Sequence, residues 1–110
     1  AASHALDYDD VARSVNGHPS VPVVPVLLAL GEELGASGRD ILDAFVIGVE
    51  IEGKIGDMTN GGHYQQGFHA TGTIGTLGAA AAAARLMKLD DLARTVKQLE
   101  KRLGNEKDDA

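Results

Sequence analysis

Apolar residues in this chain recur at intervals of three and four positions rather than two, and this spacing constrains its fold more than any other feature. Ile41, Phe45 and Val49 form one such series. Intervals of three and four place side chains on one face of a helix, whereas strands require alternation. The sequence therefore predicts an all-α fold, in which four to five helices pack as a small bundle.

Capping residues suggest where the first two long helices begin. The first predicted helix spans 21–34 and takes Ser20 as its N-cap. The second spans 37–55 and opens with Ser37 and Asp40, which approximate a capping box. Both helices carry the apolar positions that a bundle core needs.

A glycine-rich region follows the second predicted helix. Residues 56–70 combine four glycines with two histidines and a tyrosine, and we expect them to form a functional loop. Gly72, Gly75 and Gly78 then recur at intervals of three before six alanines. Because each glycine costs a helix roughly 0.5–1 kcal/mol relative to alanine, we expect these glycines to let another backbone approach closely. The alternative is a flexible linker.

The end of the chain changes character, and we divide the sequence into a partial helical domain, 1–90, and a tail, 91–110. Apolar residues alternate steps of three and four across this boundary: Leu89, Leu92, Val96, Leu99 and Leu103. This pattern predicts a short amphipathic helix followed by a charged tail. The helix either docks on its own domain or forms a self-association seam.

Composition excludes several classes of protein. With 110 residues the chain fits one small domain, and the absence of cysteine excludes disulfides, zinc–thiolate sites and iron–sulfur clusters. Residues 1–84 hold ten acidic and three basic side chains, a net charge of −7, so we expect no nucleic-acid partner. No apolar run reaches the roughly 18 residues that would span a bilayer, and we expect a soluble, cytoplasmic protein. The start at Ala1, without methionine or a leader, suggests a piece of a longer protein.

Histidines and acidic residues are the candidates for chemistry. An aspartate that orients a histidine produces a general base near neutral pH, suited to removing a proton beside a carboxylate. His18 and His69 also precede predicted helices, whose N-termini favour anionic substrates. Metal binding is the rival use of these residues, but no two histidines lie four positions apart, and we expect no metal site. The full set is His4, His18, His63 and His69 with Asp7, Asp9 and Asp10.

Four segments in consecutive order resemble the MmgE/PrpD family, which includes 2-methylcitrate dehydratase and cis-aconitate decarboxylase. They are HALDYDD at 4–10, GHPS at 17–20, ILDAFVIGVEIEGKIG at 41–56 and GFHATGTIGTLGAAAAAARLMKLD at 67–90. The resemblance spans about residues 3–90. It implies a cofactor-independent lyase or isomerase that acts on small polycarboxylates, usually as a homodimer of chains with a helical domain and a lid domain.

The resemblance also implies site residues. Carried over onto this sequence, the catalytic residues are Asp7, His18 and His69, with no cofactor and no metal. Val11 stands where the family has a threonine-like residue, and the family's later lysines have no counterpart here. We expect a truncated piece of a 2-methylcitrate dehydratase-like lyase from propionate metabolism, and we expect it to be homo-oligomeric. Because binding of a polycarboxylate needs several cations, we expect this piece to be inactive alone. The alternatives are a helical interaction module without catalytic activity and an oligomeric active lyase.

Overall fold

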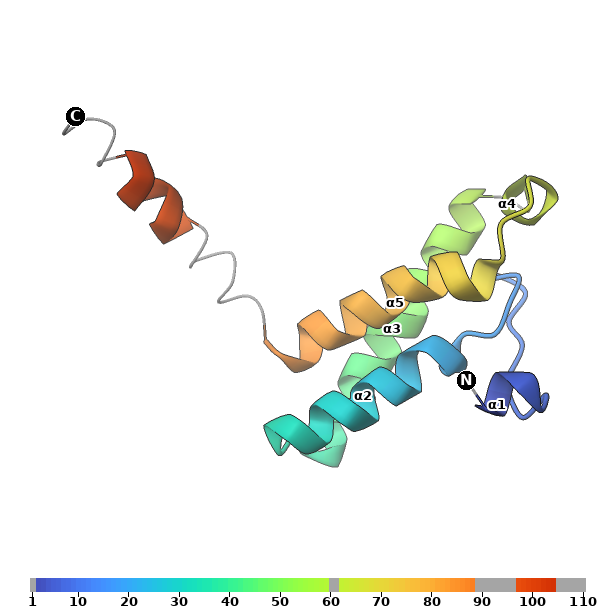
Figure 1. Cartoon of the computed structure of the whole chain (residues 1–110), viewed down its shortest axis with the longest axis horizontal. Helices are drawn as coiled ribbons and strands as arrows, with labels where there is room; N and C mark the ends of the chain where they lie inside the picture. The colour runs from blue at the N-terminus through green and yellow to red at the C-terminus, as the bar shows by residue number, and fades with distance from the viewer. Residues whose placement is uncertain (1, 60–61, 89–96, 105–110) are drawn as a thin grey trace.

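The computed structural model describes residues 2–59, 62–88 and 97–104, and within these residues its regular structure is helical, without a β-strand. The helices are α1 (Ala2–Ala5), α2 (Ser20–Leu34), α3 (Gly38–Thr59), α4 (Gly62–Gln65) and α5 (Ala70–Leu86), and residues 97–104 form a further helix (Figure 1). The predicted all-α class is confirmed.

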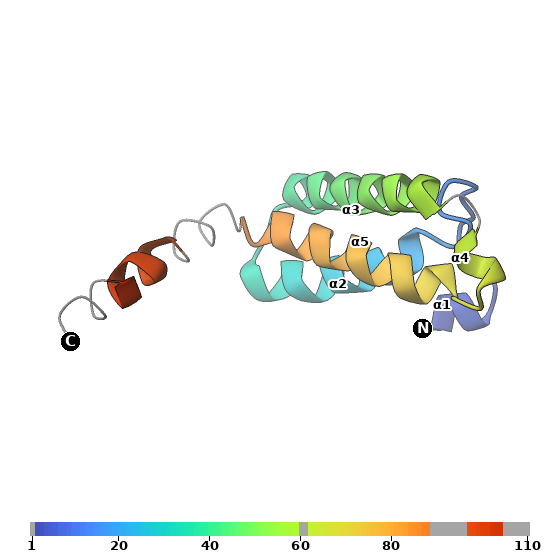
Figure 2. The ribbon, with the colours of Figure 1, turned by 90° about the horizontal axis from the view of Figure 1, so that it is seen from above.

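Three long helices build the bundle. Helix α5 packs along both α2 and α3, and those two helices also contact each other (Figure 2). The main core gathers Val23, Leu27, Ala44, Ala82 and Leu86. A second buried cluster lies toward the start of α5, where Val15 from the loop before α2 packs against Ala70 and Ile74. This second cluster fixes the loop that carries the polar residues discussed below.

Helix α2 is capped by a residue ten positions before it, which the sequence did not predict. Ser20 is the first helical residue rather than the N-cap, and Pro19 at the cap position makes no side-chain cap hydrogen bond. Instead the Asp10 carboxylate accepts hydrogen bonds from the Ser20 backbone N–H at 3.1 Å and from its hydroxyl at 2.5 Å. The carboxylate thereby replaces the local cap.

Helix α3 begins as predicted and ends one turn later. The Ser37 hydroxyl accepts a hydrogen bond from the Asp40 backbone N–H at 3.1 Å, which confirms the cap. The most buried positions of α3 recur every four residues and are mainly small: Ala44, Gly48, Glu52 and Gly56. The apolar stripe predicted to face the core is only half-buried: Ile41, Phe45 and Val49. Small residues occupy most of the buried face of α3 because they allow α5 to approach closely.

Two of the three glycines of α5 meet neighbouring chain segments as expected, whereas a Cβ atom at Gly72 would meet only the His69 ring, at 3.7 Å. A Cβ atom at Gly75 would lie 2.6 Å from the Pro22 ring, and one at Gly78 would overlap the Glu52 side chain. The flexible-linker alternative is therefore wrong. The expectation of an open loop over 56–70 is wrong in part, because residues 56–59 complete α3 and four residues form α4.

The tail prediction is tested only in part. Leu89, Leu92 and Val96 lie outside the described residues, whereas residues 97–104 are helical and exposed at every position, including Leu99 and Leu103. Docking of this helix on the bundle is not seen in its described part, and the domain boundary at residue 90 stays a prediction. Within the described chain, none of the helices is both long and apolar enough to cross a membrane.

Close packing at Gly56 gives a stability prediction. A Cβ atom there would overlap the backbone carbonyl of Ser14, which cannot rotate away, so we expect Gly56→Ala to lower the free energy of unfolding by about 1–3 kcal/mol. Gly53 is the matched control one turn earlier, because its Cβ would meet only the Ser14 hydroxyl at 3.4 Å. Gly53→Ala should be neutral or stabilising by up to about 1 kcal/mol. Urea unfolding measures both, and equal effects would contradict the packing argument.

Candidate functional site

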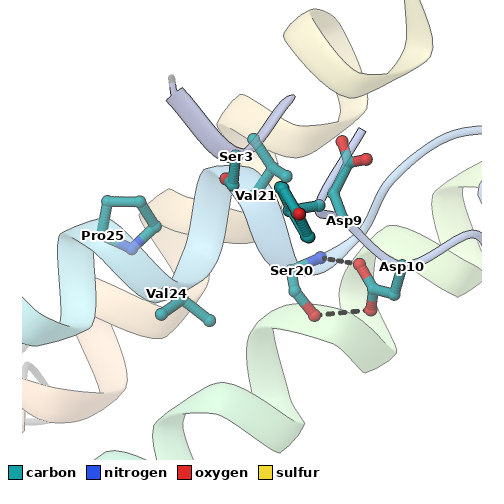
Figure 3. Close-up of a pocket in the computed structure, with 8 residues that line it drawn as sticks. Ser3, Asp9, Asp10, Ser20, Val21, Val24 and Pro25 are labelled. Atoms are coloured by element: carbon teal, nitrogen blue, oxygen red, sulfur yellow. Dashed lines mark hydrogen bonds between the residues drawn. The ribbon is translucent and has the colours of Figure 1, made fainter. Parts of the chain in front are cut away.

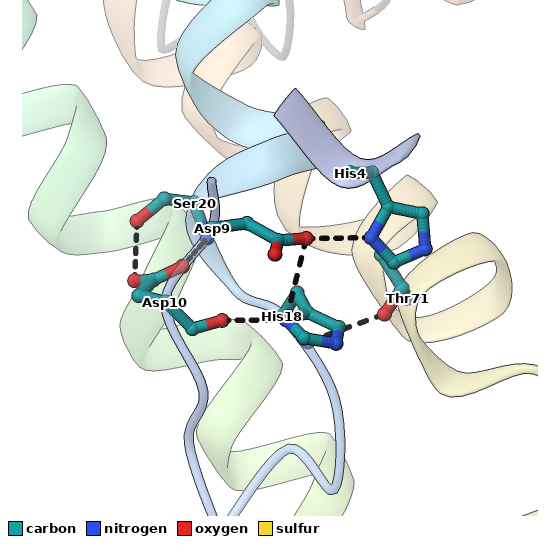
Figure 4. A network of polar contacts seen from close by, with 6 residues as sticks. All are labelled: His4, Asp9, Asp10, His18, Ser20 and Thr71. Atoms are coloured by element: carbon teal, nitrogen blue, oxygen red, sulfur yellow. Dashed lines mark hydrogen bonds and ion pairs between the residues drawn. The ribbon is translucent and has the colours of Figure 1, made fainter. Parts of the chain in front are cut away.

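A buried carboxylate lies at the centre of the polar cluster. The Asp9 side chain is only 2% exposed, and its Oδ2 atom lies 2.6 Å from His4 Nδ1 and 3.3 Å from His18 Nδ1 (Figure 4). His4 comes from α1 and His18 from the loop before α2. The turn between α1 and this loop therefore brings two imidazoles onto one aspartate.

His18 is fixed by its surroundings more firmly than the other histidines. Its Nδ1 lies 2.7 Å from the backbone carbonyl oxygen of Asp10, and its backbone N–H donates to the Thr71 hydroxyl of α5 at 3.2 Å. A carbonyl oxygen only accepts hydrogen bonds, so Nδ1 is the donor in this contact. In the neutral ring the lone pair is then on Nε2. This tautomer suits a general base whose Nε2 faces a substrate.

His69 joins the same region from α5. It occupies the N-cap position of that helix, its side chain is exposed, and it makes no capping hydrogen bond. Its ring centroid lies 5.6 Å from that of His4, which is in turn 4.9 Å from that of His18. We call His4, His18 and His69 the histidine cluster. Because the N-terminus of α5 lies beside it, the cluster favours an anionic ligand.

The structure brings together two of the three residues predicted to be catalytic. His18 and His69 both belong to the histidine cluster, but Asp7 is exposed in the turn after α1, with a left-handed φ of 56°. Among the described residues, the carboxylate that contacts the histidines is Asp9, two positions later. The catalytic roles of Asp7, His18 and His69 stay predictions. His63 lies apart, stacked on Phe68 with its Nε2 against the Thr73 hydroxyl.

An open pocket of about 340 Å³ lies beside Asp9 and Asp10, against the first turns of α2 (Figure 3). Figure 3 shows the Asp10 carboxylate facing Ser20 at one side and Val24 with Pro25 along the helix. Its lining residues are Ser3, Tyr8, Asp9, Asp10, Ser20, Val21, Val24 and Pro25. This lining contains no lysine or arginine, which matches the shortage of cations expected from the sequence.

Glu52 is a buried acid that the sequence analysis missed. Its side chain is 0% exposed, and neither carboxyl oxygen has a hydrogen-bond partner among the described residues. Burial, with a smaller contribution from the negative charge of Asp10, raises the pKa of Glu52 from 4.5 to about 8. Its place in a series of small residues on α3 was the available signal, because a charged residue at such a position faces the neighbouring helix.

Comparison with known proteins now decides the family. Residues 1–96 match the MmgE/PrpD N-terminal domain. The chain belongs to the MmgE/PrpD family. It is 39% identical over 93 residues to proteins named cis-aconitate decarboxylase from Homo sapiens and from Mus musculus. Each alignment covers 80% of this chain and 19% of the relative, so the chain spans about a fifth of the length of these relatives. No solved structure gives a significant match.

The match to the MmgE/PrpD domain contains the whole bundle and the histidine cluster. The resemblance drawn from the sequence motifs is therefore confirmed over a slightly longer range than the predicted residues 3–90. In this family member, α2, α3 and α5 form a scaffold, and the loop between α1 and α2 carries two of the clustered polar side chains.

The raised pKa of Glu52 predicts how stability depends on pH. The folded state keeps a proton that the unfolded chain releases at about pH 4.5, so the stabilisation is fully present below pH 4.5 and is lost as pH rises toward 8. Glu52→Gln should flatten this fall in melting temperature, since the amide does not titrate. The matched control is Glu50→Gln on the same helix, an exposed residue 3.9 Å from Lys54, which should leave the fall unchanged. Identical profiles for both variants would refute the assignment.

Proposed function

We propose that this chain supplies the histidine part of an active site for acid–base lyase chemistry on small polycarboxylates. The observation that carries the proposal is the contact of His4 and His18 with the buried carboxylate of Asp9, with the His69 ring 5.6 Å from that of His4. Membership of the MmgE/PrpD family supports it, as does the name of the relatives, cis-aconitate decarboxylase, which specifies a tricarboxylate as their substrate.

The geometry suits proton transfer. In its neutral form His18 presents Nε2 as a base, while the Asp10 carbonyl oxygen holds Nδ1–H in place. Such a base removes a proton next to a carboxylate, and the resulting imidazolium protonates the hydroxyl that departs as water. In a decarboxylation no carbon-bound proton is removed: the protonated ring donates its proton to the carbanion that forms when CO₂ leaves. The N-terminus of α5, with His69 at its cap, would interact with one carboxylate of the substrate.

The charge balance sets a limit on what this chain binds alone. Residues 1–84 carry a net charge of −7, and the lining of the pocket beside Asp9 contains no lysine or arginine. A di- or tricarboxylate requires cationic partners. We therefore assign the anchoring cations to polypeptide outside these 110 residues, consistent with relatives about four times as long. We expect the 110-residue chain to bind weakly and to show no turnover. A cytoplasmic location also stays a prediction.

Titration of the chain with cis-aconitate, followed by NMR of the histidine ring protons, tests this proposal. We expect the signals of His4, His18 and His69 to shift with a dissociation constant above about 1 mM, because anchoring cations are lacking. His63 is the internal control, since it lies outside the cluster. His18→Ala should abolish the shifts at the other two histidines, whereas His63→Ala should preserve them.

Two results would count against this assignment. If millimolar cis-aconitate and 2-methylcitrate leave all four histidine signals in place, the cluster does not bind polycarboxylates. If binding is micromolar, or if the chain alone releases CO₂ from cis-aconitate, the cations needed for anchoring are already present and the expectation of an incomplete site is wrong.

A second function, self-association, is favoured by an apolar groove between α2 and α3. The groove has a volume of about 250 Å³ and only apolar residues line it: Val24, Leu27, Leu28, Ile41, Leu42 and Phe45. Leu28 and Leu42 are 61% and 65% exposed. We propose that a second copy of the chain covers this groove. A two-fold contact places the same surface against itself, and an uncharged groove meets no like-charge repulsion there.

Light scattering coupled to size-exclusion chromatography checks this interface. We expect a dimer for the parent chain and a monomer for Leu42→Glu, because the new carboxylate would be buried against its counterpart. Leu77→Glu is the matched control, since Leu77 is 52% exposed on α5 and does not line the groove. A monomeric parent chain at high concentration, or equal dissociation by both variants, would exclude the groove as the interface; circular dichroism shows whether each variant is folded.

A further inference from the structure

We propose that His4, Asp9 and His18 bind a divalent transition-metal ion such as Zn²⁺. One donor atom from each of these residues lies within 4.8 Å of the other two, and Asp9 Oδ2 lies 2.6 Å from His4 Nδ1 and 3.3 Å from His18 Nδ1. The inference does not rest on lyase chemistry, and it departs from the sequence-based expectation of no metal site. That expectation considered histidine spacing along one helix, whereas these ligands come from α1 and from the loop before α2.

The separations within the trio are close to those of a zinc site. Ligand atoms at about 2.0–2.1 Å from a tetrahedral ion lie about 3.3 Å from one another. The Asp9–His18 separation is 3.3 Å, and the Asp9–His4 separation is 2.6 Å because a hydrogen bond joins these atoms. An ion that replaces the proton shared by Asp9 and His4 lengthens the Asp9–His4 separation and leaves the Asp9–His18 separation unchanged. His4 can make that movement, since α1 has four residues and none of them is buried.

A fourth donor is already in place. The carbonyl oxygen of Asp10 lies 2.7 Å from His18 Nδ1, where it accepts the ring proton. When an ion binds Nδ1, the proton on that atom transfers through solvent to Nε2, so the carbonyl loses its donor. The freed oxygen is then available to the ion. Two imidazole nitrogens, one carboxylate and one carbonyl complete a four-coordinate set, or water from the adjoining pocket takes the fourth position.

The donor types select the class of ion. Mg²⁺ and Ca²⁺ prefer six or more oxygen ligands, whereas sites with imidazole nitrogen suit Zn²⁺, Co²⁺, Ni²⁺ and Cu²⁺. Charge also favours a cation, because Asp9 is almost fully buried and its ion-pair partners among the described residues are the two histidines. Bound metal would occupy His18 and thereby remove it from proton transfer.

Calorimetric titration with Zn²⁺ near neutral pH tests the site in the full 110-residue chain. We expect one ion to bind per chain, and we expect His4→Ala and Asp9→Asn each to weaken binding by about tenfold or more. His63→Ala is the matched control, because it removes a histidine whose recorded partners are Thr73 and Phe68. Titration with Co²⁺ should in addition give the visible absorption bands of a four-coordinate ion, and these bands should disappear in His4→Ala.

Three results would overturn the proposal: no saturable binding of either ion, Zn²⁺ affinity unchanged in His4→Ala, or an equal loss of affinity in His63→Ala. Asp9→Asn can destabilise the fold, since the carboxylate is buried, whereas His4→Ala alters a short helix with no buried residue. His4→Ala therefore decides the outcome if circular dichroism shows that Asp9→Asn is unfolded. None of these measurements requires enzymatic turnover, so failure of the metal site and failure of the lyase proposal are distinguishable.

Discussion

The close approach of α3 and α5 is the contact on which the rest of the structure depends. Small residues make it possible, because a Cβ atom at Gly48 of α3 would press on Ala82 and Gly78 of α5, and one at Gly78 would overlap the Glu52 side chain of α3. The glycines weaken each helix taken alone, but close packing recovers dispersion contacts along its length. This contact also fixes the N-terminus of α5 beside the loop before α2, where Thr71 accepts a hydrogen bond from the His18 backbone.

Two adjacent aspartates, Asp9 and Asp10, have different structural roles at the site. The Asp10 side chain caps α2 through Ser20, while its carbonyl oxygen orients the His18 ring. The Asp9 side chain is buried against His4 and His18. Because a single dipeptide anchors both a helix and a histidine, the position of the cluster is coupled to the start of α2. Proton transfer uses Nε2 of His18 and metal binding uses Nδ1, and an ion on Nδ1 leaves the ring proton on Nε2, so the two proposed roles compete for His18.

Sequence patterns were informative where the physics is local. The capping interaction between Ser37 and Asp40 and the intervals of three and four between apolar residues follow from short-range rules. The choice between carboxylates was not local. Asp7 and Asp9 differ by two positions, and only the left-handed turn at Asp7 decides which of them meets the histidines. The buried face of α3 was also missed, because hydrophobic periodicity gives little weight to glycine.

Glu52 places a further acidic side chain at the centre of a bundle that has few cations, and its protonation makes this burial tolerable. The carboxyl lies between α3 and α5 without a partner among the described residues, and its pKa of about 8 keeps it largely neutral at pH 7. Ionisation would place an uncompensated charge in the helix contact and repel Asp10, whose side chain caps α2 and whose carbonyl holds His18. The proton on Glu52 therefore preserves both the packing of the glycine-rich helices and the placement of the histidine beside them.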